Sequence, residues 1–391
     1  MSETPGRRPI AIATGTRADW GLLRPIAEEL RRLGDEPLIL ATHAHLMPEM
    51  GHTVDEITAD CFTPAAMIPA EGEPAEATAQ AVEGFADALR RLKPRMLLIL
   101  GDRFEMLGAA SAALLCGVRI AHIAGGTVSA GAFDDAIRNA ISMMAEIHFP
   151  ETDRCAARLR AFGIPEERII TAGAPGLHGL QMLKKAASRK NASEDSADAD
   201  QPWQRWIDRG DPFLVVTLHA ETRPADKNYS HGGATEALLD LLEPLLPAYR
   251  LILTYPNADV DPEPAIRSLK AFAERHPEHV FLTPSLGHRR YLKCVVASRG
   301  VVGNSSSGLV EVPSLGVPTL DLGHRQDGRE CGPSVVRCPQ FPAPEAADLP
   351  ALDALSYILT PKCQEMAKRT INPYYRPDTV EKIAATLHGI S

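Results

Sequence analysis

Short aliphatic runs alternate with longer amphipathic stretches through the first part of the chain. Residues 9–14, 37–41, 96–100 and 118–123 have the length and composition of buried strands. Apolar residues recur at helical spacing in 22–33 and 75–92, and an alanine-rich helix is expected after residue 103. The segment 15–21 is predicted to be a turn. Strand and helix in this alternation predict parallel β-α-β units in a doubly wound sheet.

The alternation stops and then restarts. Residues 184–200 are rich in Ser, Asp, Lys and Ala and have almost nothing to bury, so they predict a mobile surface loop at a domain boundary. Further strands are expected at 213–218, 249–254, 279–282, 300–302 and 318–322, and helices at 235–246, 309–315 and 379–387. We therefore expect an N-terminal domain over 1–183, a linker over 184–204, a C-terminal domain over 205–365, and a helical segment over 366–391 that could close against either domain.

Polar residues follow strand after strand, at the edge where open α/β sheets bind ligands. They are Arg17, Asp19, Asp102, Arg103, His219, Asn257, Asn304, Ser305, Ser306 and Ser307. One such strand end is common in any α/β protein, but five of them predict a functional cleft. Asp102 and Arg103 could supply a general base and a cation, although an aspartate after a strand is also a routine helix cap.

Two segments of the second half have the chemistry of an anion site. Residues 302–308 combine Gly, Asn and three serines before a predicted helix, which suits a phosphate but also suits a simple N-cap turn. Glu311 could accept ribose hydroxyls or merely favour the helix dipole. Arg325 and Arg329 flank a glycine turn and could bind a diphosphate, or could form a solvated basic turn.

Composition excludes several classes of protein. The 391 residues suit two domains, and a formal charge of −9 argues against a nucleic-acid binder. No apolar run approaches the roughly 18 residues of a membrane helix, and the polar start predicts no signal peptide. The seven scattered cysteines form no C-x-x-C pair, so neither a disulfide framework nor a zinc site is expected. G-x-G-x-x-G and P-loop motifs are absent, so dinucleotide-dependent redox chemistry and P-loop NTPase chemistry lose their usual markers. We expect a soluble cytoplasmic α/β protein.

Nine short motifs cover nearly the whole chain: 14–19, 45–46 with 51–53, 101–105, 122–126, 134–138, 173–175, 255–257, 303–306 and 323–329. In this order they resemble the UDP-N-acetylglucosamine 2-epimerase family, and more closely its hydrolysing, sialic-acid-type branch, which forms N-acetylmannosamine. The resemblance implies an α/β, GT-B-like fold with two Rossmann-like domains facing a central cleft. It also implies a C-terminal helix that crosses back to the first domain, and no metal or nicotinamide cofactor.

The resemblance further implies roles for single residues. Ser305 and Ser306 would bind the diphosphate, Glu311 the ribose, and Arg17 and His219 the phosphates and the leaving group. The other implied substrate-binding residues are Asp19, His45, Asn257, Asn304, Arg325 and Arg329. Family members eliminate UDP across C1–C2 to give a 2-acetamidoglucal, and then add water with inversion at C2. That chemistry needs a carboxylate for the C2 proton and cations for the leaving diphosphate.

Asp102 is the candidate for the C2 proton, and the other catalytic candidates are Arg103, Asp134, Asp135 and His219. The chain departs from the family pattern at Thr127, where a glutamate is usual, and at Asn139, where a histidine is usual. Threonine cannot carry a proton at neutral pH. Either Asp134 or Asp135 substitutes for the glutamate, or one half-reaction is slow, or the substrate differs.

Several functions therefore stay open. The expected partner is a UDP-sugar, and the expected assembly is a homodimer or homotetramer that binds neither nucleic acid nor membrane. The substrate could be UDP-N-acetylglucosamine or another UDP-2-acetamido sugar such as UDP-N,N′-diacetylbacillosamine, and the product could be the free sugar or UDP-N-acetylmannosamine. A catalytically weakened UDP-sugar-binding protein is a further alternative. A GT-B glycosyltransferase would need an acceptor, because fold alone does not fix chemistry.

Overall fold

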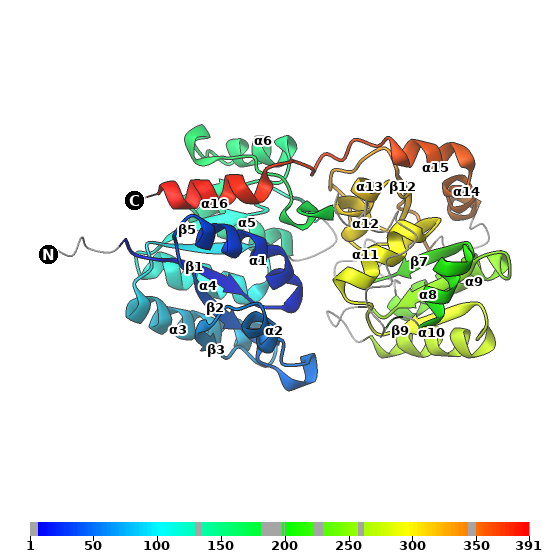
Figure 1. Cartoon of the computed structure of the whole chain (residues 1–391), viewed down its shortest axis with the longest axis horizontal. Helices are drawn as coiled ribbons and strands as arrows, with labels where there is room; N and C mark the ends of the chain where they lie inside the picture. The colour runs from blue at the N-terminus through cyan, green and yellow to red at the C-terminus, as the bar shows by residue number, and fades with distance from the viewer. Residues whose placement is uncertain are drawn as a thin grey trace, which may run out of the picture. The chain divides into compact units, whose positions relative to one another are not determined.

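The computed structural model describes residues 7–129, 134–180, 198, 200–221, 230–256, 262–342 and 349–390 (Figure 1). The chain divides into two compact units. Unit 1 comprises Met1–Thr127, Asp134–His178 and Tyr374–Ser391, and unit 2 comprises Val128–Phe133 and Gly179–Pro373. Each unit is a doubly wound α/β domain, which confirms the predicted fold class.

Unit 1 has one six-stranded parallel sheet in the order β3-β2-β1-β4-β5-β6. Its strands are β1 (Ile10–Thr14), β2 (Leu38–Thr42), β3 (Pro64–Ile68), β4 (Met96–Leu100), β5 (Arg119–Ile123) and β6 (Ile147–Phe149). The sequence pattern did not predict β3 and β6. These are the two edge strands. β3 begins with a proline, which is tolerated because only one side of that strand is paired, and β6 has three residues and only a single bridge, from His148 to Ile169, on its outer side.

The helices of unit 1 cover both faces of this sheet. They are α1 (Arg17–Arg32), α2 (Val54–Ala59), α3 (Pro74–Leu92), α4 (Phe104–Leu115), α5 (Asp134–Met144), α6 (Asp153–Ala161) and α16 (Thr379–Gly389). The prediction of a turn over 15–21 is wrong beyond Thr16. Thr16 Oγ1 accepts the Asp19 N–H at 3.2 Å and caps α1, so the helix begins at Arg17.

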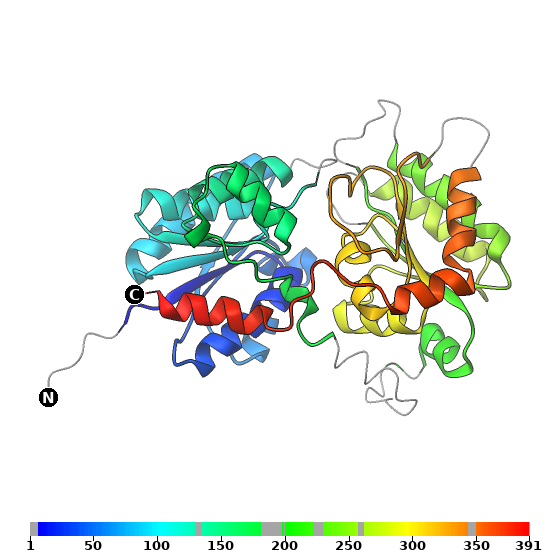
Figure 2. The same cartoon turned by 90° about the horizontal axis from the view of Figure 1, so that it is seen from above.

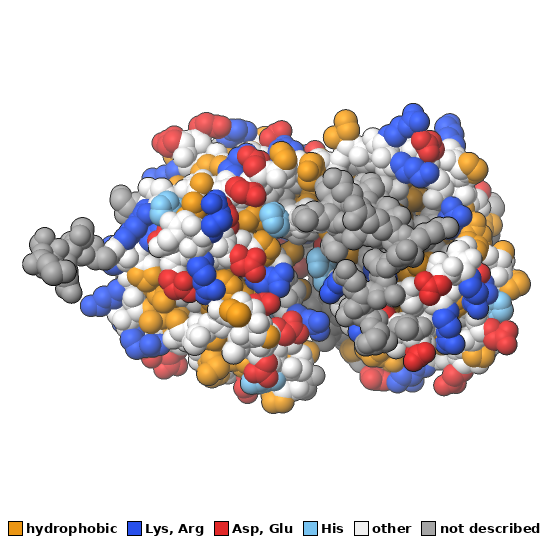
Figure 3. Space-filling view, viewed as in Figure 1, with side chains coloured by type: hydrophobic (Ala, Val, Ile, Leu, Met, Phe, Trp, Pro, Cys, Tyr) orange, Lys and Arg blue, Asp and Glu red, His pale blue; other side chains and the backbone are white. Residues whose placement is uncertain are grey.

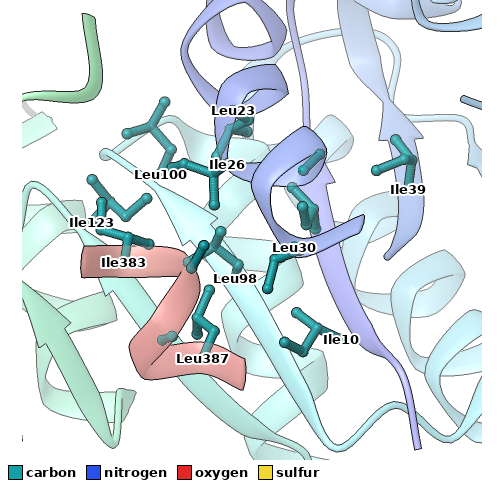
Figure 4. Close-up of a cluster of buried hydrophobic side chains, with 14 of the residues drawn as sticks. Ile10, Leu23, Ile26, Leu30, Ile39, Leu98, Leu100, Ile123, Ile383 and Leu387 are labelled. Atoms are coloured by element: carbon teal, nitrogen blue, oxygen red, sulfur yellow. The ribbon is translucent and has the colours of Figure 1, made fainter. Parts of the chain in front are cut away.

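The core of unit 1 follows the two-residue period of its strands. Ile10 and Ile12 pack with α1 and α16 on one face, whereas Ala11 and Ala13 pack with α3 and α4 on the other. Ile383 and Leu387 of α16 reach the same cluster as Leu30 of α1 (Figure 4). The last helix therefore lies alongside α1 as part of the core of unit 1 (Figure 2).

Unit 2 repeats the same sheet order, β12-β11-β10-β7-β8-β9, with all strands parallel. Its strands are β7 (Phe213–Thr217), β8 (Arg250–Thr254), β9 (Val280–Thr283), β10 (Gly300–Gly303), β11 (Thr319–Leu322) and β12 (Val335–Cys338). Its helices are α8 (Pro202–Arg209), α9 (His231–Leu242), α10 (Glu263–Arg275), α11 (His288–Ala297), α12 (Ser307–Val310), α13 (Val312–Leu315), α14 (Leu349–Ile358) and α15 (Pro361–Lys368).

The single helix predicted over 309–315 is two short helices, α12 and α13, that meet at Glu311. Pro313 has no N–H to continue the hydrogen-bond ladder, so the break falls just before it. The predicted loop over 184–200 lies outside the described residues apart from Asp198 and Asp200. Within the described helices, none is long and apolar enough to cross a membrane. Both signs of charge are interspersed over the face that Figure 3 displays.

Candidate active site

Each sheet reverses the direction of its connections at one point. The reversal lies between β1 and β4 in unit 1, and between β7 and β10 in unit 2. Ligands of open α/β sheets bind at the carboxyl ends of the strands beside such a switch point. The predicted site residues that directly follow these four strands are Arg17, Asp19, Asp102, Arg103, His219, Asn304, Ser305 and Ser306.

Arg17 and Asp19 lie in the first turn of α1. Arg17 is exposed, and its Nε lies 3.1 Å from Glu56 Oε1. Asp19 Oδ2 is buried and has no hydrogen-bond partner among the described residues. Burial raises the pKa of Asp19 above its ordinary value; Arg103 opposes the shift and Glu105 adds to it. Asp19 is therefore available to accept a hydrogen bond.

Glu105 is a member of this group whose importance the sequence did not reveal. Its side chain has no exposed surface, and its Oε1 accepts a hydrogen bond from Arg103 Nε at 2.5 Å. Its Oε2 is buried without a partner among the described residues. A Cβ on Gly15 would overlap Glu105 Oε1, so a larger residue at position 15 would require this carboxylate to move.

Asp102 follows β4 and forms an ion pair with Arg138, which is almost fully buried. Its turn is held by His122, whose Nε2 lies 2.8 Å from the Gly101 carbonyl oxygen and whose Nδ1 lies 3.1 Å from Ser142 Oγ. Burial lowers the pKa of His122 to about 4, so the ring is neutral near pH 7. His122 therefore positions the turn and carries no charge to it.

Two arginines bind the Asp135 carboxylate of α5. Asp135 accepts hydrogen bonds from Arg138 Nη1 at 3.2 Å and from Arg158 Nη2 at 3.1 Å. The same arginines donate to the Thr127 carbonyl oxygen, at 2.8 and 2.9 Å. The structure thus brings Asp102 and Asp135 together through Arg138, while Asp134 is the first residue of α5.

Thr127 and Asn139, which depart from the family pattern, both form side-chain hydrogen bonds. The Thr127 side chain is buried, and its hydroxyl donates to Glu151 Oε2 at 3.3 Å. Asn139 Nδ2 donates to Asp135 Oδ2 at 3.3 Å. Neither residue can exchange a proton near pH 7, so Asp134 and Asp135 remain the nearby candidates for the role of the missing glutamate.

His45 is not available to a substrate in this structure, which corrects its implied role. Its side chain is fully buried, with Nε2 2.9 Å from Thr14 Oγ1 and Nδ1 2.9 Å from Thr53 Oγ1. Burial lowers the pKa of His45 to about 4. The ring therefore connects the end of β1 to the segment before α2, as a neutral positioning group.

In unit 2 the switch point depends on Gly303. Its φ is +138°, and a Cβ there would lie 1.8 Å from the Thr217 carbonyl oxygen, so no other residue fits between β7 and β10. Asn304 then joins the two strands: its Oδ1 accepts the His219 N–H at 2.7 Å, and its Nδ2 donates to the His219 carbonyl oxygen at 2.9 Å. Both ends of the Asn304 amide thus contact the His219 backbone, so Asn304 positions the segment after β7.

His219 lies at the end of β7. Burial, with smaller contributions from the positive charge of Arg325 and from the neighbouring His231, lowers its pKa to about 3. In the structure the ring is therefore neutral near pH 7. The ring can donate or accept a hydrogen bond, but it carries no positive charge near pH 7.

Ser305 and Ser306 are partly exposed and follow Asn304 directly. Ser306 is the N-cap residue of α12, which is a single turn, so the segment offers hydroxyl and N–H groups more than a long helix dipole. Glu311 lies at the break after α12, with its Oε1 2.9 Å from His288 Nε2. The hydrogen bond to Glu311 raises the pKa of His288, against the effect of burial.

Arg325 and Arg329 lie in the turn that follows β11. Gln326 Nε2 and Arg325 Nη1 approach the Asn304 carbonyl oxygen at 2.8 and 3.4 Å, which ties this turn to the segment after β10. Arg329 Nη2 donates to Ser129 Oγ at 3.2 Å. The serine segment and the arginine turn are therefore adjacent, as a shared diphosphate site requires.

Asn257 lies outside the described residues. Among the described residues, no group of three or more His, Cys, Asp or Glu side chains is arranged to hold a metal ion. The contacts of Arg138 and Arg158, like that of Glu105, were not predicted from the sequence. Arg138 belongs to the motif 134–138, and its spacing of three residues from Asp135 on a helix could have predicted an ion pair between them.

Comparison with known proteins assigns the chain to one family. The family profile described as UDP-N-acetylglucosamine 2-epimerase matches residues 28–388. The chain is 32% identical over 330 residues to the GDP/UDP-N,N′-diacetylbacillosamine 2-epimerase (hydrolyzing) of Campylobacter jejuni, covering 83% of this chain and 82% of that protein. It is 30% identical over 338 residues to the UDP-N,N′-diacetylbacillosamine 2-epimerase (hydrolyzing) of Legionella pneumophila, covering 84% of each.

A solved structure shares the fold over nearly the whole chain. The UDP-GlcNAc 2-epimerase of Neisseria meningitidis, bound to UDP-GlcNAc, superposes with a TM-score of 0.78 at 18% identity, covering 98% of this chain and all of that one. At this identity the likeness concerns the fold alone. It confirms the two-domain α/β architecture that the sequence predicted.

Proposed function

The chain belongs to the UDP-N-acetylglucosamine 2-epimerase family, and we propose that it is a hydrolysing 2-epimerase. It converts a UDP-2-acetamido sugar and water into UDP and the free sugar inverted at C2. The observation that carries the proposal is the position of Asp102 and of the serine segment, each at the switch point of its own sheet. Two relatives that are 32% and 30% identical to this chain over the matched regions are hydrolysing enzymes by name, which supports it further.

The nucleotide half of the site belongs to unit 2. Ser305 and Ser306 donate hydrogen bonds to the diphosphate, and Arg325 and Arg329 balance its charge. Glu311 accepts the ribose hydroxyls. The neutral His219 ring donates a hydrogen bond to the departing phosphate oxygen. The contacts of Asn304 with His219 and with the arginine turn support this arrangement, because they hold the three segments in one cluster.

The proton chemistry belongs to unit 1. In the first step Asp102 takes the C2 proton, the C1–O bond breaks, and the electron pair leaves with UDP while a C1–C2 double bond forms. In the second step water supplies a hydroxyl to C1 and C2 receives a proton on the opposite face. Two proton-handling groups are thus needed, and we assign the second role to the Asp134–Asp135 pair in place of the missing glutamate.

The leading substrate candidate is UDP-N,N′-diacetylbacillosamine, on the strength of the relatives that are 32% and 30% identical. UDP-N-acetylglucosamine is the second candidate, supported by the description of the family. The two substrates share the diphosphate, the ribose and the 2-acetamido group, so the site described above serves either one. They differ at C4 and C6 of the sugar.

A proton NMR time course in deuterium oxide with each UDP-sugar tests the proposal. We expect release of UDP and a free sugar of the C2-inverted configuration with deuterium at C2, without any acceptor. Retention of hydrogen at C2 would refute the elimination mechanism. Formation of a UDP-linked epimer would indicate a non-hydrolysing enzyme, and UDP release only in the presence of an acceptor would indicate a glycosyltransferase.

A further inference from the structure

Three residues of unit 2 form a row across the carboxyl end of its sheet. Asp321 of β11 is in register with Gly303 of β10 on one side and with Arg337 of β12 on the other. Paired residues of neighbouring strands point to the same face. Asp321 therefore lies between the glycine that begins the serine segment and an arginine of the next strand.

Arg337 binds the backbone of the arginine turn, residues 325–329. Its Nη2 donates to the carbonyl oxygens of Gln326 at 2.9 Å and of Arg329 at 3.1 Å. Its Nε lies 3.6 Å from Asp321 Oδ2, and its Nη1 lies 4.0 Å from Asp327 Oδ1. The position of the turn is thus linked to the charge of Asp321 through a single guanidinium group.

Asp321 is unusual for an aspartate because its side chain is only 3% exposed. Its Oδ1 is buried without a hydrogen-bond partner among the described residues. The charged groups that act on it are Arg337 on β12 and, on the turn, Asp327, Arg329 and Arg325. Burial and the charge of Asp327 raise its pKa and the three arginines lower it, and together they bring the pKa of Asp321 to about 7.

We propose that Asp321 is a positioning residue that takes up a proton when a nucleoside diphosphate binds to the arginine turn, and releases it when the nucleotide leaves. The inference rests on the proposed function, in which the diphosphate lies on this turn. An arriving diphosphate engages the positive charge of Arg325 and Arg329, which in the empty turn helps to offset the Asp321 carboxylate. With less positive charge to offset it, a buried carboxylate favours its neutral form.

Linkage fixes the sign of the effect. Because binding favours protonated Asp321, protonation of Asp321 must favour binding by the same factor. The contribution of Asp321 to UDP binding is therefore most favourable below pH 7, where the carboxyl group is protonated. The affinity declines as the pH rises through about 7. Ionisation of the terminal phosphate of UDP changes affinity in the opposite direction, but that change is common to every variant of the protein.

Calorimetry of UDP binding between pH 6 and 8.5, in pairs of buffers with different ionisation enthalpies, measures both the affinity and the protons taken up. We expect Asp321→Asn to bind UDP as the wild type does at pH 6, and about fivefold more tightly than the wild type at pH 8.5. Near pH 7 the variant should take up fewer protons than the wild type. Asp240→Asn, an exposed change on α9 of the same unit, is the matched control and should behave as the wild type.

Asp327→Asn provides a second test that does not depend on the folding of Asp321→Asn. It removes a carboxylate that raises the pKa of Asp321. The proton uptake of Asp327→Asn on UDP binding should therefore be centred at a lower pH than that of the wild type. Equal proton uptake by the wild type and Asp321→Asn, or an unmoved centre in Asp327→Asn, would overturn the inference and leave the proposed function intact. A wild type that does not bind UDP would overturn the proposed function as well.

Discussion

Asp102→Asn separates the catalytic and the structural contributions of one carboxylate. The substitution keeps the shape of the side chain but removes the base and the charge that faces Arg138. A general base contributes roughly 10²–10⁴-fold to turnover, which is about 3–5 kcal/mol of activation free energy. We therefore expect turnover to fall by that factor, while UDP binding stays near that of the wild type because its contacts lie in unit 2.

The same substitution has a cost in stability that the structure bounds. Breaking a fully buried ion pair costs about 3–5 kcal/mol of unfolding free energy. Asp102 is 23% exposed, and Arg138 retains Asp135 Oδ1 at 3.2 Å and the Thr127 carbonyl oxygen at 2.8 Å. We therefore expect a smaller loss, about 1–3 kcal/mol, because hydrogen bonds to charged groups supply contributions of that size.

Turnover per folded molecule, UDP calorimetry and urea unfolding measure the three effects separately. Asp87→Asn, which changes an exposed pair with Arg90 on α3, is the matched control and should alter stability by less than about 0.5 kcal/mol. Undiminished turnover in Asp102→Asn would remove Asp102 from the mechanism and direct attention to Asp134 or Asp135. A fall in turnover that disappears after correction for the unfolded fraction would show that Asp102 acts only as the partner of Arg138.

Three further predictions concern other parts of the molecule. Ser305→Ala combined with Ser306→Ala should weaken UDP binding at least about tenfold, because each hydroxyl bond to an ionised diphosphate contributes about 1.5–3 kcal/mol; unchanged calorimetry would exclude these serines from the site. Thr127→Glu should lower the melting temperature without raising turnover, since the new carboxylate would be buried beside Glu151; a more active variant would show that the site accepts the usual glutamate. Unit 1 should lose stability as the pH falls from about 6.5 toward 4, by up to roughly 3 kcal/mol for each histidine whose pKa burial lowers to about 4, and equal urea midpoints at pH 7 and 5 would refute this. These histidines are His45, His122 and His148.

Local sequence signals were sufficient where a structural feature depends on neighbours in the chain. The strand runs and the restart of their alternation predicted the four central strands of each sheet, because a buried parallel strand needs only a short apolar run. The start of α1 was also signalled, since Thr16 and Asp19 have the spacing of a helix cap, but the glycines at 15 and 21 suggested a turn instead. The break at Glu311 could have been predicted from Pro313.

The depth of a side chain in the fold was not predictable in the same way. The motif match gave His45 a place in the site, but its burial depends on Thr14 and Thr53, which come to it from two other segments. Likewise the partner of Asp102 lies on α5, and only the pairing of β4 with β5 brings that helix near. Which predicted residues face a substrate and which position others is therefore a property of the tertiary structure.

The docking of α16 has a consequence for how the protein is made. Unit 1 begins to emerge from the ribosome first, yet Val380, Ile383 and Leu387 of its core are synthesised after all of unit 2. At about 5–20 residues per second, the roughly 200 intervening residues take about 10–40 s to translate. Throughout that interval the nascent domain exposes the apolar surface of Leu30 and Ile10 that α16 later covers, and exposed apolar surface of this kind promotes aggregation and is what chaperones bind.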